Sequence, residues 1–197
     1  MKSESFDIAI IGAGASGSIA SSYLSKYFNV VCLDQGAWTN PLDHPHYYQN
    51  WESKLLDAWN PSSNIRGNQY DYEKISTTSN ILDWPGVGGG TNIYTALWPR
   101  LRPSDFYKFD EHQMAPNWPI DYGDLEYYYD ETDKLVGVSG LKGNPAMPTQ
   151  SDYPLPALPF TKTSKYISKT FDKLQWHWWP IPAGVISEDY NGRPACN

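Results

Sequence analysis

Three glycines near the start of the chain have the spacing of a phosphate-binding loop. Gly12, Gly14 and Gly17 form the pattern G-x-G-x-x-G. The preceding residues, 6–11, are a short apolar run that predicts a strand buried in a parallel sheet. The following residues, 15–27, repeat apolar side chains at helical spacing. The loop is therefore expected between a strand and a crossover helix, which is where a dinucleotide-binding loop belongs.

Each glycine has a separate role in that arrangement. Gly12 permits the tight turn, Gly14 leaves room for a pyrophosphate, and Gly17 lets the helix pack closely on the strand. The anion then lies at the N-terminus of the helix. Ala15 and Ser16, which open the helix, are therefore part of the predicted site.

An acidic residue follows the glycine loop at the distance expected of a ribose-binding carboxylate. Residues 29–33 predict a second strand, which ends at Asp34, 17 residues after Gly17. The Asp34 carboxylate is expected to accept hydrogen bonds from ribose hydroxyl groups, with Gln35 beside it. Such an acid serves FAD or NAD, and aspartate rather than glutamate slightly favours NAD.

A second glycine-rich stretch, residues 86–92, decides between these cofactors. An NAD domain does not need it, whereas the extended FAD molecule needs a second backbone segment along its pyrophosphate and ring. The alternative is a loop that merely needs positive φ angles. The FAD interpretation adds six residues to the predicted site: Gly88, Gly89, Gly90, Thr91, Asn92 and Tyr94.

Composition excludes several other functions. The net charge is −7 and basic residues form no stripe, which argues against nucleic-acid binding. No apolar run approaches the roughly 20 residues that cross a bilayer, and no signal peptide is recognised. A cytoplasmic location is expected, and membrane or periplasmic association through a partner is left open. Cys32 and Cys196 suggest no disulfide framework. His44 and His46 lack a third ligand at metal-binding spacing, so no metal site is predicted.

The remaining aromatic residues and histidines give weaker signals. His112 and His177 are isolated, and no histidine is assigned a catalytic role. Most of the nine Trp and fifteen Tyr are interpreted as core or interface residues. Trp98 and Tyr94 are exceptions, because they follow the second glycine loop and could face a flavin ring.

The rest of the chain predicts one further domain boundary. Residues 37–80 are an excursion interrupted by prolines, and residues 121–136 predict a helix. Residues 143–160 are proline-rich and are interpreted as a linker, which places a boundary near residue 140. A helix over residues 164–174 and a strand over residues 176–179 are expected beyond it.

Several ordered motifs resemble the glucose-methanol-choline (GMC) oxidoreductases, and in particular the sugar and gluconate dehydrogenase flavoprotein subunits. They are GAGASG with Asp34, WPGVGGGT, PRLRPSDF, NWPIDYGDLEYYYDE, GVSG, YPLPALP and DYNGRPAC. The resemblance implies an α/β fold with a Rossmann-like, three-layer β/β/α domain that binds FAD. Residues 1–140 would be the N-terminal, incomplete part of that domain. Residues 141–197 would hold the linker and the start of a substrate-binding domain.

The resemblance also implies a function. An alcohol or sugar CH–OH group would be oxidised by hydride transfer to flavin N5, with a catalytic histidine beyond residue 197. Ile93 occupies the position of the histidine that tethers flavin in some members, so noncovalent FAD is expected. An electron-acceptor subunit is a further implied partner. Two alternatives remain open: an NAD(P)-dependent reductase and a noncatalytic cofactor-binding module.

Overall fold

The computed structural model describes residues 4–38, 86–92, 94–148 and 151–196. These form two compact units, residues 1–95 and residues 96–197. The described chain is mixed α/β with two small parallel sheets. The complete three-layer Rossmann-like sheet stays a prediction, as does the domain boundary near residue 140.

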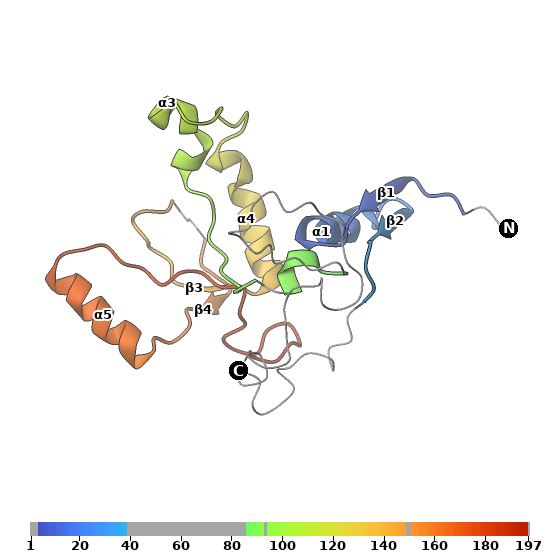
Figure 1. Ribbon diagram of the computed structural model, residues 1–197. Coiled ribbons are helices and arrows are strands. Elements are labelled where there is room, and N and C mark those ends of the chain that lie inside the picture. Colours follow the sequence, from blue (N-terminus) through green and yellow to red (C-terminus); the bar gives the residue numbers. More distant parts are fainter. Residues whose placement is uncertain (1–3, 39–85, 93, 149–150, 197) are drawn as a thin grey trace, which may run out of the picture. The chain divides into compact units, whose positions relative to one another are not determined.

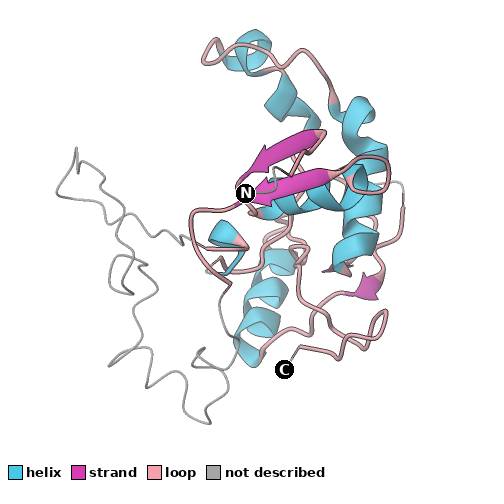
Figure 2. Cartoon of the chain, turned by 90° about the vertical axis from the view of Figure 1, so that its right-hand side faces the viewer, coloured by secondary structure: helices cyan, strands magenta, loops and turns pink. Residues whose placement is uncertain are grey.

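The first unit contains the predicted βαβ arrangement (Figure 1). Strand β1, Ile8–Ile11, pairs in parallel with β2, Val30–Leu33, in the register Ile8 to Val30 and Ile11 to Leu33. Figure 2 shows these two strands as the pair of long arrows lying side by side. Helix α1, Ala15–Leu24, crosses between them and packs against both.

Helix α1 is shorter than the sequence predicts. The apolar repeat continues to Tyr27, but the helix ends at Leu24 and the backbone N–H of Tyr27 donates to the Leu24 carbonyl in a tight turn. This turn brings Val30 to the start of β2. The helical repeat of apolar side chains therefore extends past the helix end.

The two strands leave much of their apolar surface uncovered by described residues. Ile8, Ile10 and Val31 are half-buried, and Ile11 is 80% exposed. Strands of a parallel sheet are normally covered on both faces.

The second unit is built around helix α4, Tyr122–Val136. Asp121 caps its N-terminus by accepting a hydrogen bond from the backbone N–H of Asp124, whose carboxylate accepts from the N–H of Asp121 in return. Gly137 ends the helix with a left-handed φ of 81°. These end signals explain why the prediction of residues 121–136 is confirmed almost to the residue.

The second unit also contains elements shorter than α4. They are the 3-10 helix η5, Pro103–Phe106, the helices α3, Lys108–His112, and α5, Lys162–Lys173, and the strands β3, Ser139–Gly140, and β4, Leu155–Pro156. The core of this unit lies beside β3, where Val138 is fully buried and Ser139 exchanges two backbone hydrogen bonds with Ala183.

Two sequence predictions are wrong in this unit. Leu155 lies in the segment interpreted wholly as a linker, yet it is buried and β4 pairs in parallel with β3. Residues 176–179 form no strand. Their aromatic side chains instead make ring contacts and indole hydrogen bonds: Trp176 meets Phe171, and the Trp178 N–H donates to Asp172.

Candidate cofactor site

The first glycine loop is fastened to the end of β2. Gly12 has a φ of 95°, which favours glycine, and its backbone N–H donates to the Leu33 carbonyl at 2.7 Å. The Asp34 carboxylate accepts from the N–H of Ala13 at 2.8 Å and from the N–H of Gly36 at 2.9 Å. The hydrogen bond from Ala13 is the main reason that the pKa of Asp34 lies below its ordinary value.

Gly17 and Gly14 are glycines for different reasons. A Cβ atom at Gly17 would overlap the carbonyl oxygen of Gly12, so close packing within the loop requires glycine there. A Cβ atom at Gly14 would meet no described heavy atom within 4 Å, and its φ of −74° is open to any residue. The described chain does not itself require glycine at position 14, whereas a closely approaching phosphate would.

The second glycine loop contacts the first. The backbone N–H of Gly88 donates to the Ala13 carbonyl at 2.8 Å, and a Cβ atom at Gly89 would lie 3.4 Å from Gly14 Cα. Residues Gly89–Asn92 form the 3-10 helix η4, which packs against α1. The structure thus brings together two loops that are far apart in the sequence.

Side chains within the second loop hold its shape. The Asn92 amide donates to the carbonyl oxygens of Val87 at 3.0 Å and Gly89 at 3.2 Å, and the Thr91 hydroxyl donates to the Gly88 carbonyl at 2.6 Å. The simple need for positive φ explains Gly88, at 101°, and Gly89, at 52°. It does not explain Gly90, whose Cβ would meet no described atom within 4 Å.

The remaining predicted site residues lie on exposed parts of the first unit. Ala15 and Ser16 open α1, whose N-cap, Gly14, has no side-chain hydrogen bond. Gln35 follows Asp34, and Tyr94 is 43% exposed. Partial burial raises the pKa of the Tyr94 hydroxyl. Ile93 lies outside the described residues, as do His44 and His46.

Sequence reasoning missed the part played by Ala13. Its N–H donates to Asp34 while its carbonyl accepts from Gly88, so one residue links β2 to both glycine loops. Ala13 makes both contacts through its backbone, so the residue type at position 13 does not signal them. The Asp34 carboxylate consequently braces the loop, a role additional to the predicted ribose contact.

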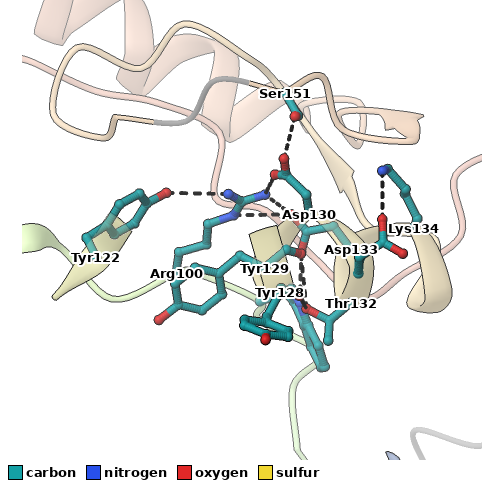
Figure 3. A network of polar contacts seen from close by, with 11 residues as sticks. Arg100, Tyr122, Tyr128, Tyr129, Asp130, Thr132, Asp133, Lys134 and Ser151 are labelled. Atoms are coloured by element: carbon teal, nitrogen blue, oxygen red, sulfur yellow. Dashed lines mark hydrogen bonds and ion pairs between the residues drawn. The ribbon is translucent and has the colours of Figure 1, made fainter. Parts of the chain in front are cut away.

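The second unit holds a buried ionic network of its own (Figure 3). The Arg100 guanidinium lies 2.6 Å from Asp130 Oδ1 and 2.6 Å from Asp133 Oδ2, and it donates to the Tyr122 hydroxyl. Burial opposes its charge, but the hydrogen bonds from Arg100 to Asp133, Asp130 and Tyr122 raise its pKa above the ordinary value.

Trp98 belongs to this network. Its indole N–H donates to Asp133 at 3.1 Å, which gives the side chain a structural use. The predicted contact of Trp98 with a flavin ring stays a prediction. His177 faces the side-chain oxygen of Asn144 at 3.0 Å, and both Cys32 and Cys196 are exposed free thiols. No helix within the described residues is long and apolar enough to cross a membrane.

Comparison with known proteins identifies relatives that match almost the whole chain. It is 36% identical to 2-methyl-1,2-propanediol dehydrogenase of Mycolicibacterium austroafricanum, over 96% of this chain and 35% of that protein. It is 28% identical to the fructose dehydrogenase large subunit of Gluconobacter japonicus, over 98% of this chain and 39% of that one. It is 23% identical to the gluconate 2-dehydrogenase flavoprotein of Pantoea cypripedii, over 93% and 36%.

These matches show how much of each relative the chain covers. The chain spans between 35% and 39% of the length of these three relatives. No protein-family model matches the chain. The resemblance predicted from the sequence motifs is nevertheless confirmed: over nearly its whole length the chain is similar to proteins named as dehydrogenases of a diol, of fructose and of gluconate, one of which is named a flavoprotein.

Proposed function

We propose that this chain is the FAD-binding N-terminal part of a GMC-type oxidoreductase that oxidises a CH–OH group of an alcohol or sugar. One observation carries the proposal most directly. Gly14 and Gly90 lie on two loops joined by a backbone hydrogen bond, and no described neighbour accounts for glycine at either position. An extended dinucleotide that approaches both backbones would account for both.

The residues present fit FAD by their chemistry. The N-terminus of α1, with Gly14, Ala15 and Ser16, offers backbone N–H groups and a positive dipole end to the pyrophosphate. Asp34 would accept from the ribose hydroxyls with the lone pairs that Ala13 and Gly36 leave free. The second loop, from Gly88 to Asn92 with Tyr94, would lie along the rest of the cofactor. FAD, when bound, supplies the acceptor for a hydride at flavin N5.

Binding is proposed to be noncovalent, because Ile93 carries no nucleophilic atom. The substrate class is proposed from the relatives, which are named for a diol, for fructose and for gluconate. An electron-acceptor subunit is a further proposal, because the fructose dehydrogenase relative is named a large subunit. No catalytic residue is assigned to this chain.

The test is flavin incorporation in the full-length protein that contains this chain. The wild-type protein is expected to purify with a flavin absorption spectrum and to reduce that flavin when an alcohol or sugar substrate is added. Gly14→Val is expected to abolish flavin incorporation, because the isopropyl group occupies the space for the pyrophosphate.

The matched control introduces a valine within α1 instead of at its N-cap. Ser22→Val lies on an exposed position of that helix and is expected to retain flavin. A Gly14→Val variant with a normal flavin spectrum would contradict the assignment of the first loop. Wild-type protein that lacks flavin but binds NAD would favour the reductase alternative.

A further inference from the structure

Helix α5, Lys162–Lys173, is amphipathic and carries a row of lysines (Figure 1). Thr161 caps its N-terminus by accepting a hydrogen bond from the backbone N–H of Ser164 at 3.1 Å, so the sequence itself fixes where the helix begins. Residues three or four positions apart lie on the same side of a helix. Four lysines have this spacing and form one basic face: Lys162, Lys165, Lys169 and Lys173.

The positive charge of this basic face is not paired within the described residues. No ion pair joins any of its four ammonium groups to a described carboxylate, and the printed sequence places a single acidic residue, Asp172, on α5. Asp172 accepts a hydrogen bond from the Trp178 indole N–H at 2.8 Å. Lysine ion pairs in the described chain instead involve Lys108, Lys134 and Lys142. The sequence prediction that basic residues form no stripe therefore does not hold for α5.

The opposite face of α5 is apolar and exposed. Ile167, Phe171 and Leu174, the C-cap residue, are also three or four positions apart and lie on the side away from the lysines. An amphipathic helix normally buries such a face against its own protein. No residue of α5 is buried, and Ile167 and Leu174 are 46% and 51% exposed. Trp176 extends the apolar face, because it packs on Phe171 with ring centroids 5.5 Å apart and is itself 60% exposed.

We infer that α5 binds the surface of a bilayer that contains anionic lipids. A helix with lysines on one face, and with apolar side chains and tryptophan on the other, lies in the plane of the lipid headgroups. The apolar face of α5 enters the boundary between headgroups and acyl chains. The lysines are attracted to the lipid phosphates and keep their ammonium groups at the level of water. This contact is with the membrane surface and does not span the bilayer.

An acidic protein is the alternative partner for a basic helix. A folded protein contacts one side of a helix, so carboxylates that met the lysines would leave the apolar face of α5 in water. A lipid surface uses both faces at once, because the apolar side chains enter the lipid while the lysines stay among the phosphates. The exposed apolar face therefore favours the bilayer. The inference goes beyond the proposed function and requires neither flavin nor substrate.

The test is co-sedimentation of the full-length protein with vesicles of phosphatidylcholine mixed with phosphatidylglycerol, and with vesicles of phosphatidylcholine alone. The wild-type protein is expected to bind the anionic vesicles and to dissociate as salt is raised, because salt screens exposed charges. Lys165→Gln combined with Lys169→Gln is expected to weaken this binding by more than about tenfold, at roughly fivefold for each lysine near an anionic surface.

Two further double variants complete the experiment. Lys108→Gln with Lys134→Gln removes the same charge from α3 and α4, and it is expected to leave vesicle binding unchanged. Ile167→Ser with Leu174→Ser keeps the lysines but makes the exposed apolar face polar, and it is expected to weaken binding even at low salt. Circular dichroism of each variant verifies that the helices are retained.

Each outcome supports or overturns the inference. Weaker binding of both α5 variants, with the α3 and α4 control unchanged, supports it. Wild-type protein that ignores anionic vesicles, or that binds neutral vesicles equally well, overturns it. An effect of the lysine variant without an effect of the serine variant also overturns it, because a charge contact alone suits an acidic protein. Flavin content and alcohol oxidation of the same preparations test the proposed function separately.

Discussion

The backbone N–H of Gly88 donates a hydrogen bond to the carbonyl oxygen of Ala13. Ala13 lies between the first two glycines of the first loop, and its own N–H is held by Asp34. Hydrogen bonds therefore connect the two glycine loops and the end of β2 in one group. A change in any of the three should affect the others.

Gly17→Ala should destabilise the protein, because the added methyl group overlaps the Gly12 carbonyl oxygen. We expect the free energy of unfolding of the flavin-free protein to fall by about 1–3 kcal/mol, as for other overpacked sites. Gly90→Ala is the control, since its methyl group meets no described atom within 4 Å. Equal stability of the two variants in urea unfolding would contradict this account of the loop.

Asp34→Asn should weaken the same group and alter its response to pH. The hydrogen bond from Ala13 lowers the folded-state pKa of Asp34. Its contribution to stability is therefore present above the unfolded pKa of about 3.9 and is lost as the pH falls through the lower folded value. We expect Asn to reduce the free energy of unfolding by about 1 kcal/mol at pH near neutrality.

The measurement for Asp34 is urea unfolding of wild type and variant at neutral pH and at a series of pH values below about 4. The difference between the two proteins should shrink towards the acid end. A difference that is constant across this range would show that the Asp34 charge does not brace the loop.

Arg100→Met should be among the most damaging substitutions in the second unit. It leaves Asp130 and Asp133 without their cation, and breaking a buried pair from one side costs about 3–5 kcal/mol. Lys134→Gln breaks an exposed pair with Glu131 and should leave the stability almost unchanged, because solvent screens such pairs. Thermal unfolding of both variants measures this difference in stability. Similar melting temperatures for Arg100→Met and Lys134→Gln would contradict the prediction.

Acid precipitation of the full-length protein should release its flavin into the supernatant. The expectation follows from Ile93, which has no side-chain atom able to form a covalent bond to flavin. Absorbance of the supernatant and of the washed pellet gives the result. Flavin that stays with the pellet would mean that another residue tethers it.

Sequence patterns predicted the elements whose signals are local. The G-x-G-x-x-G loop, β1, β2 and α4 were predictable because glycine spacing, β-branched runs and capping residues such as Asp121 act over a few positions. The prediction was wrong for residues 176–179, since a run of aromatic side chains suits a strand but packs here on α5 and its surroundings.

Contacts between distant residues could not be read from the sequence. Arg100 and Asp133 are 33 positions apart, and neither is marked as buried by its neighbours in the chain. The link from Ala13 to Gly88 uses backbone groups that every residue except proline carries. The sequence therefore predicted the two glycine loops as a candidate site, whereas it could not predict the hydrogen bonds that join them.

A second backbone hydrogen bond, next to that between Gly88 and Ala13, ties the second glycine loop to the segment that follows β2. The Val87 N–H donates to the Ala37 carbonyl at 3.3 Å, although these residues are 50 positions apart in the sequence. The two ends of this stretch are thus fixed next to one another. The chain between positions 37 and 87 must therefore leave and return to the same place, whatever its length.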